Sequence, residues 1–227
     1  MKRSILFSLL LFIITACGGG KMFADQRYPE KQIPEQVKAP VYEALLAYPE
    51  LKGVKIKFVF KEGLGMHFMQ AQPDPSTIFE EPSERTYLIK MTPSMEISDK
   101  RSVPISEMPR EVLVGWFAHE LGHIMDYMDE GTVGMMWFGV RYYLSSDFKI
   151  SAERQADIFA IEAGFSEEII ATKNFILNNT ALPDDYIAKI EELYLSPANV
   201  LEIVEDLSEE DSEEEMSEEF EEVSNEG

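Results

Sequence analysis

Two histidines and a glutamate near the middle of the chain have the types and the spacing of a metal-dependent hydrolytic site. They lie in the run His119-Glu120-Leu121-Gly122-His123, inside a stretch whose apolar residues recur at helical spacing. Residues four apart project from the same face of a helix, so the two imidazoles can hold one metal ion. Glu120 is rotated by about 100° from His119. Its carboxylate then lies beside the metal, where it can take a proton from water.

A third ligand must come from elsewhere, because catalytic zinc usually has three protein ligands and an open position for water. Downstream, Glu153 and Asp157 are four residues apart and share a helical stripe with Ala156, Ala160 and Gly164. The small residues would let this helix approach the first one closely, and a buried carboxylate there needs a partner. Glu153 is therefore the candidate third ligand. The alternative is that Glu153 pairs with an arginine on a solvated face.

The two motifs together, HELGH and the downstream ExxAD, resemble those of the gluzincin metallopeptidases. The resemblance rests on residues 107–164 and covers the preceding strands more loosely. It implies one zinc ion held by His119, His123 and Glu153, with Glu120 as the general base.

The same resemblance implies further roles outside the ligand set. Asp157 would orient His119, which fixes the tautomer of a ligating imidazole. An edge strand above the cleft, expected at Arg85–Thr92, would hold an extended peptide by β-augmentation.

A competing ligand is Asp129, which occupies the last position of the metzincin pattern HExxHxxGxxH. The glycine that turns the chain in that pattern is replaced here by Asp126, so nothing in the sequence ends the helix early. Asp129 therefore ranks below Glu153 as a ligand.

The sequence leaves the oxyanion donor open. Thermolysin-type enzymes use a downstream histidine and a tyrosine, but no histidine follows His123. Tyr142 and Tyr143 lie close to where the family places its tyrosine, and either could donate a hydrogen bond. Each could equally be buried in a helix interface. Arg141 is a second candidate donor, whereas His67 is left out because a lone histidine is more often structural.

The elements that must position these residues run strands first and helices afterwards. Residues 54–60 and 85–92 alternate between apolar and polar side chains, and 66–70 is a candidate strand between them. Prolines make 71–84 an irregular loop. Further helical segments are expected over residues 41–48, 107–129, 152–163, 166–178 and 184–194.

Local signals define the ends of the two helices that carry the motifs. Ser106 and Ser151 are placed to cap them, and Gly164 could end the second. Between them lies the apolar stretch Val133–Leu144. Its central run, Met135–Val140, is expected to pack in the core; the alternatives are a pocket wall or a surface patch that touches lipid.

These elements predict an α+β fold of the zincin-like type. A small, mainly antiparallel sheet would be followed by a helical subdomain, with the metal between helices 107–129 and 151–163.

The N-terminal stretch is typical of a bacterial lipoprotein. A basic start precedes the apolar run Ile5–Ala16, and the only cysteine of the chain, Cys17, follows directly. This order resembles a lipobox, which implies removal of residues 1–16 and lipidation of Cys17. With Gly18 next to the cysteine, the resemblance also implies sorting to the outer membrane. The alternative is ordinary secretion with a free thiol.

The lipid chains would hold the protein on a membrane without spanning it. Residues 17–38 are then expected to be a tether and residues 39–201 the metallopeptidase domain.

The chain is strongly acidic. It has 42 Asp and Glu against 20 Lys and Arg, a net charge of −22, which argues against binding to nucleic acid. Residues 202–227 hold 14 acidic residues and no basic ones, so they are expected to form a solvated, disordered tail. A role of the tail in binding calcium or a basic partner is the alternative.

The sequence thus predicts a zinc-dependent endopeptidase anchored in the bacterial envelope, with peptides or unfolded proteins as substrates. The alternative is a binding protein that keeps the zincin scaffold without useful catalysis. The missing downstream histidine and the acidic tail motivate that alternative.

Overall fold

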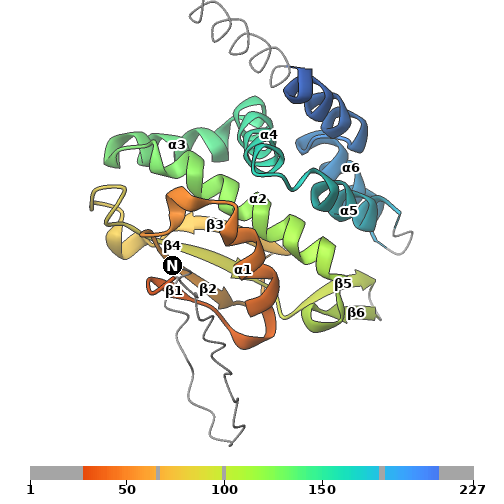
Figure 1. The fold of residues 1–227 in the computed structure, drawn as a ribbon, viewed down its shortest axis with the longest axis horizontal. Coiled ribbons are helices and arrows are strands. Elements are labelled where there is room, and N and C mark those ends of the chain that lie inside the picture. The colour runs from red at the N-terminus through yellow and green to blue at the C-terminus, as the bar shows by residue number, and fades with distance from the viewer. Residues whose placement is uncertain (1–27, 65–66, 99–100, 179–181, 210–227) are drawn as a thin grey trace, which may run out of the picture.

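The computed structural model describes residues 28–64, 67–98, 101–178 and 182–209. It has an α+β architecture with a small sheet and a helical region (Figure 1). Helix α2 (Arg110–Met128) crosses between them and contacts the sheet as well as the helices that follow it.

The main sheet has four strands in the order β1-β2-β4-β3. Their bounds are β1 Lys31–Gln32, β2 Lys55–Phe60, β3 Met69–Pro73 and β4 Thr86–Met91. β1 and β4 both pair with β2 in parallel, and only β3 pairs antiparallel, with β4. The prediction of a mainly antiparallel sheet is therefore wrong for this sheet. The reason is that β3 lies at the edge of the sheet, and the chain then returns as β4 between β3 and β2. β4 therefore runs antiparallel to β3 and parallel to β2.

The order of the strands also corrects the predicted edge strand. β4, which the sequence places at Arg85–Thr92 as the edge above the cleft, lies inside the sheet between β2 and β3. The edge strand on that side is β3. A second sheet pairs β5 (Ser94–Ser98) with β6 (Arg101–Pro104) in antiparallel fashion, and the sequence pattern did not predict it.

The described residues form six further α-helices. They are α1 Lys38–Leu46, α3 Thr132–Leu144, α4 Ser146–Glu162, α5 Ser166–Leu177, α6 Asp184–Leu193 and a helix over residues 197–209. The predicted caps are only partly correct. α2 begins after Pro109 and not after Ser106, and α4 begins six residues before Ala152, where the Ser145 side chain accepts a hydrogen bond from the Phe148 N–H. Gly164 follows α4 with a φ of 87°, as a helix-ending glycine does.

The folded region extends further at both ends than the sequence predicts. The sequence assigns residues 28–38 to the tether, yet Tyr28 and Val37 are buried and β1 pairs with β2. It assigns residues 202–209 to a disordered tail, yet they are helical, and Ile203 and Val204 pack against the core. The predictions for residues 1–16, for Cys17 and for the tail beyond residue 209 lie outside the described residues. Among the described helices, none has the length and hydropathy needed to cross a bilayer.

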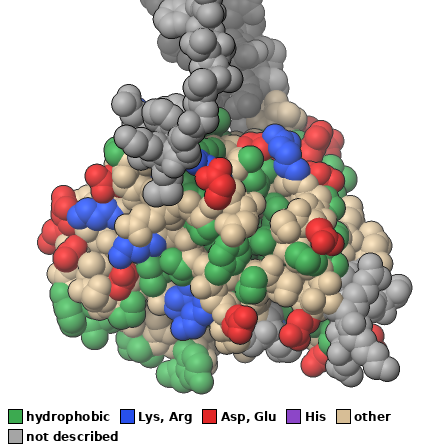
Figure 2. Space-filling view, turned by 90° about the horizontal axis from the view of Figure 1, so that it is seen from below, with side chains coloured by type: hydrophobic (Ala, Val, Ile, Leu, Met, Phe, Trp, Pro, Cys, Tyr) green, Lys and Arg blue, Asp and Glu red, His purple; other side chains and the backbone are tan. Residues whose placement is uncertain are grey.

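The surface carries charges of both signs where Figure 2 shows it. Acidic and basic side chains lie there among hydrophobic ones. Exposed ion pairs such as Lys55 with Glu84, 3.1 Å apart, contribute little to stability. The fold is held by its core.

The core is organised around α2, in which every residue from Val112 to Ile124 is buried. Toward the sheet, the ring of Phe117 meets Phe58 of β2 edge-on, with centroids 5.8 Å apart. Hydrogen bonds tie the helix down on either side. The Tyr48 hydroxyl donates to the Ala118 carbonyl (2.8 Å), and the Thr172 hydroxyl donates to the Val112 carbonyl (3.0 Å). A helix that is apolar all round is buried in this way because it has no face for water.

The helices α2 and α4 touch backbone to backbone at Gly122. A Cβ atom there would lie 2.5 Å from the carbonyl oxygen of Ala156 and 3.1 Å from its Cα. Only a glycine leaves room for this approach, which lies between the two histidines of α2 and the carboxylates of α4.

Replacing Gly122 by alanine should lower the free energy of unfolding by about 1–3 kcal/mol, because the added methyl group overpacks a backbone contact. Gly139→Ala in α3 is the matched control. No atom lies within 4 Å of the position that its methyl group would take, so alanine should stabilise this helix by up to about 1 kcal/mol. Urea unfolding measures both changes. Equal stability of Gly122→Ala and the parent chain would contradict the close approach of the two helices.

Candidate metal centre

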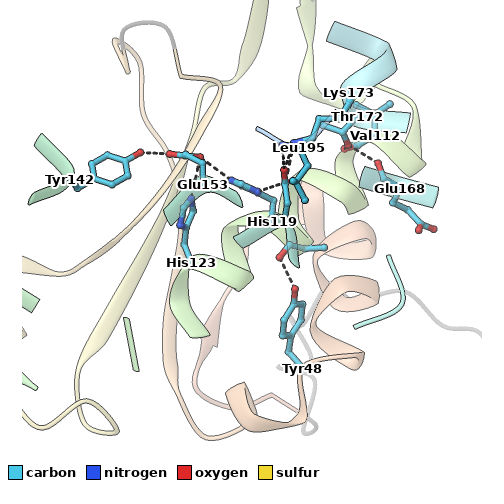
Figure 3. Close-up of polar contacts among 12 residues, drawn as sticks. Tyr48, Val112, His119, His123, Tyr142, Glu153, Glu168, Thr172, Lys173 and Leu195 are labelled. Atoms are coloured by element: carbon cyan, nitrogen blue, oxygen red, sulfur yellow. Dashed lines mark hydrogen bonds and ion pairs between the residues drawn. The ribbon is translucent and has the colours of Figure 1, made fainter. Parts of the chain in front are cut away.

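Three ligand atoms from two helices converge on one point. His119 and His123 lie one turn apart on α2, and Glu153 reaches them from α4 (Figure 3). Its Oε2 atom lies 3.3 Å from Nε2 of His119 and 3.5 Å from Nε2 of His123. All three side chains are buried, and one ligand atom from each lies within 4.8 Å of the other two.

These separations fit a metal ion. Ligands bonded to tetrahedral zinc at about 2.0–2.1 Å are about 3.3–3.4 Å from one another. The observed separations of 3.3 and 3.5 Å from Glu153 to the two imidazoles match that edge length. The His119-His123-Glu153 group could therefore hold a metal ion without rearrangement of the backbone.

The charge around this point also calls for a cation. Three carboxyl groups, of Glu120, Glu153 and Asp157, are at most 4% exposed, and among the described residues Lys173 is the one buried ammonium beside them. Buried carboxylates need compensating positive charge. Although burial lowers the pKa of His119, its bonds to Asp157 and Glu153 outweigh that effect and raise it to about 10. That rise shows how strongly the carboxylates attract positive charge to this position.

The same contacts keep the ligand carboxylate ionised. Burial alone would raise the pKa of Glu153, but the imidazoles of His123 and His119 outweigh it and hold the pKa well below its usual range. An ionised carboxylate is the form that binds metal.

Asp157 accepts four hydrogen bonds from three residues and holds His119 in place. One of its oxygens accepts from Nδ1 of His119 at 2.9 Å, as the sequence resemblance implied. The ammonium of Lys173 donates to both oxygens at 2.9 and 2.8 Å, and the Leu195 N–H donates at 3.1 Å (Figure 3). Because Nδ1 donates to Asp157, Nε2 is the nitrogen that faces Glu153 and the ligand site, where a metal ion would replace its proton.

Glu120 lies beside the ligands without joining them. It is 4% exposed, and its Oε2 atom has no hydrogen-bond partner. Burial raises its pKa, which favours the uptake of a proton. A buried carboxylate oxygen with no partner is costly.

The site opens into a cleft of about 340 Å³. Glu120, His123 and Glu153 lie on its inner wall, and the edge strand β3 forms another wall from Met69 to Pro73. Residues of α3 close the cleft from a third side, with Met135 and Phe138 buried. A segment of extended chain can therefore reach the site alongside β3.

The two candidate tyrosines have different surroundings. Tyr142 lines the cleft, and its hydroxyl donates a hydrogen bond to Oε1 of Glu153. Tyr143 is 88% exposed and does not line the cleft, so the structure does not bring it to the ligand group. Consecutive residues of a helix point about 100° apart, and only one of the two can face inward. Arg141 is also absent from the cleft, because its guanidinium lies 3.9 Å above the ring of Phe148.

Asp129 does not join the ligand group. It is exposed and lies just beyond the end of α2, at the C-cap. The helix continues for five residues after His123, which carries Asp129 about 9 Å along the axis and away from the ligands.

The structure adds residues that the sequence did not single out for the site. His67, on the connection before β3, lines the cleft, and Nζ of Lys189 lies 3.4 Å from its Nε2. Tyr194 packs its ring against His119, with centroids 5.4 Å apart. Lys173 lies over the ring of Tyr194, at 4.3 Å. No local spacing connects these residues to the HELGH run. The scarcity of histidine, three in the chain, was the one available signal for His67.

No protein family, no curated protein and no solved structure matches this chain. Its function is therefore inferred from the residues of the site.

Adding zinc should stabilise the protein against unfolding, by about 2.7 kcal/mol when free zinc exceeds the dissociation constant a hundredfold. Glu153→Gln should lose this stabilisation, because it removes one of three ligand atoms. Glu162→Gln, an exposed position at the end of the same helix, should keep it. Thermal unfolding with and without zinc, together with metal analysis, measures the effect. Equal stabilisation of both variants would exclude Glu153 as a ligand.

Asp157→Asn should destabilise the fold by about 3–5 kcal/mol, because it leaves the buried ammonium of Lys173 without a counter-charge. The double variant Asp157→Asn with Lys173→Met should recover much of this loss. Asp147→Asn, exposed in the first turn of the same helix, serves as the control. Urea unfolding compares the four proteins. A double variant no more stable than Asp157→Asn would show that the ion pair does not carry the effect.

Proposed function

We propose that the protein is a zinc-dependent endopeptidase of the gluzincin type. The observation that carries the proposal is the position of Glu120. Its partnerless carboxylate oxygen is buried beside three side chains that could hold a metal ion and on the wall of a cleft. A base next to a metal site with access to a cleft is the arrangement that hydrolysis by activated water requires.

The donor set supports zinc over other ions. Two imidazoles and one carboxylate are the ligands of many catalytic zinc sites, whereas calcium and magnesium prefer oxygen ligands throughout. His119, His123 and Glu153 would hold the ion. When bound, zinc supplies a Lewis acid for the scissile carbonyl and lowers the pKa of water.

The residues of the chain would then perform the proton transfers. Glu120 takes the proton of the attacking water and passes it to the amine that leaves. Burial raises the pKa of Glu120 above the usual value of a glutamate, which makes this carboxylate a better proton acceptor.

Two groups on the cleft wall are candidates to stabilise the oxyanion. Tyr142 offers its hydroxyl, which also bonds Glu153. His67 offers its Nδ1–H. The ammonium of Lys189 can only donate, so its contact with Nε2 requires a lone pair there and leaves the proton on Nδ1. Burial and Lys189 lower the pKa of His67 to about 4, so this imidazole is neutral at pH 7.

The edge strand β3 supports a peptide substrate. One of its edges is paired with β4, and among the described strands none pairs with the other. Free backbone groups on an edge strand bind an extended chain by β-augmentation. Because β3 also lines the cleft, a peptide paired with it would pass beside Glu120.

We also propose that the protein is attached to the bacterial envelope, at the outer membrane. This proposal rests on the order of the basic start, the apolar run and Cys17 in the sequence, where lipidation of Cys17 would provide the anchor.

Glu120→Gln should lower the rate of peptide cleavage by about 10²–10⁴-fold, the usual contribution of a general base, while zinc remains bound. The control is Glu111→Gln, an exposed position in the first turn of the same helix, which should cleave as the parent chain does. A labelled unfolded protein is the substrate, and metal analysis follows both variants. Undiminished cleavage by Glu120→Gln would exclude this base, and no cleavage by the parent chain would favour the binding protein.

A further inference from the structure

One face of helix α3 exposes an unusual amount of apolar surface. Val133, Trp137 and Leu144 are 80%, 60% and 76% exposed. The exposed apolar side chains of this helix are Val133, Met136, Trp137, Val140, Tyr143 and Leu144. Single exposed apolar residues are ordinary, but a contiguous group of this kind marks a contact surface.

The spacing of these residues places most of them on one side of the helix. Val133, Trp137, Val140 and Leu144 follow each other at intervals of four, three and four residues, so they form one stripe. The opposite side of α3 is used inside the protein, where Met135 and Phe138 are buried. α3 is therefore apolar on two sides, and the fold covers only one of them.

The charge of this segment contrasts with that of the chain. Residues 132–146 contain no Asp or Glu, although the protein has 42 of them, and Arg141 is their only charged residue. The face in Figure 2, by comparison, mixes acidic and basic side chains with its apolar ones. A segment with no carboxylates of its own meets less repulsion at an anionic or zwitterionic lipid surface than the acidic remainder of the chain would.

The side chains themselves suit the interface of a bilayer. Tryptophan and tyrosine are enriched at the level of the headgroups, and α3 exposes Trp137 and Tyr143 among aliphatic residues.

We propose that the exposed face of α3 docks onto the lipid surface to which the protein is anchored. The inference rests on the envelope attachment given under the proposed function. Ten residues, 18–27, separate Cys17 from the described fold, and a chain of that length can span up to about 35 Å between the anchor and Tyr28. Since the other side of α3 lines the cleft, docking would hold the cleft close to the membrane and favour substrates found there.

The two tryptophans of the chain make the contact measurable. Trp137 is exposed on the proposed contact face, whereas Trp116 is 8% exposed inside the fold. The full chain would be incorporated into vesicles of phosphatidylethanolamine and phosphatidylglycerol that carry brominated acyl chains. We expect Trp137 emission to shift to shorter wavelength and to be largely quenched. In Trp137→Phe, the remaining emission of Trp116 should be unquenched.

Variants separate docking from attachment. Val133→Glu with Val140→Glu should abolish the quenching while the chain remains on the vesicles, because two carboxylates would enter the contact. Leu46→Glu with Leu201→Glu, at exposed apolar positions outside α3, should leave the quenching unchanged.

Three outcomes would overturn the proposal. They are an unquenched Trp137 in the vesicle-bound parent chain, equal quenching in the Val133 and Val140 double variant, and a dimer in sedimentation that buries Trp137 without lipid. The measurement needs neither metal nor substrate. The result of the quenching experiment therefore stands even if the protein is not a peptidase. Likewise, a protein that does not dock through α3 could still be a peptidase.

Discussion

The arrangement of the site depends on one backbone contact, the approach of α2 and α4 at Gly122 and Ala156. A ligand set drawn from two helices has a fixed geometry only if the helices cannot slide apart. Gly122 has no Cβ atom, and a Cβ placed there would lie 2.5 Å from the carbonyl oxygen of Ala156. The two backbones can approach this closely only because that atom is missing. Glu153 then lies between the two imidazoles of α2. The sheet, α1 and α5 surround α2 and keep that contact in register.

Electrostatics explains why such a site is buried so completely. Carboxylates inside a protein are unfavourable unless each has a counter-charge. Lys173 supplies one for Asp157, and the two imidazoles face Glu153. A cation between the three ligand atoms would complete this compensation. The structure therefore favours a bound metal for two reasons, the separation of the donors and the sign of the local field.

The sequence predicted the parts of the site that depend on local spacing. His119, Glu120 and His123 are fixed by one helix, and the small residues beside Glu153 indicated a close helix contact. It could not predict contacts that depend on the order of elements in space. The exchange of β3 for β4 at the sheet edge and the proximity of His67 both come from tertiary packing. Which of two adjacent tyrosines faces inward depends on the rotation of α3, which an all-apolar helix does not reveal.

The bond from the Leu195 N–H to Asp157 has a consequence for the end of the chain. Leu195 connects α6 to the helix over residues 197–209, and Asp157 in turn holds His119. If His119, His123 and Glu153 hold an ion, these contacts would link its affinity to the docking of the helix over residues 197–209. Such linkage is reciprocal. A partner that displaced this helix would then change ion affinity by the same factor by which ion occupancy changed the binding of that partner.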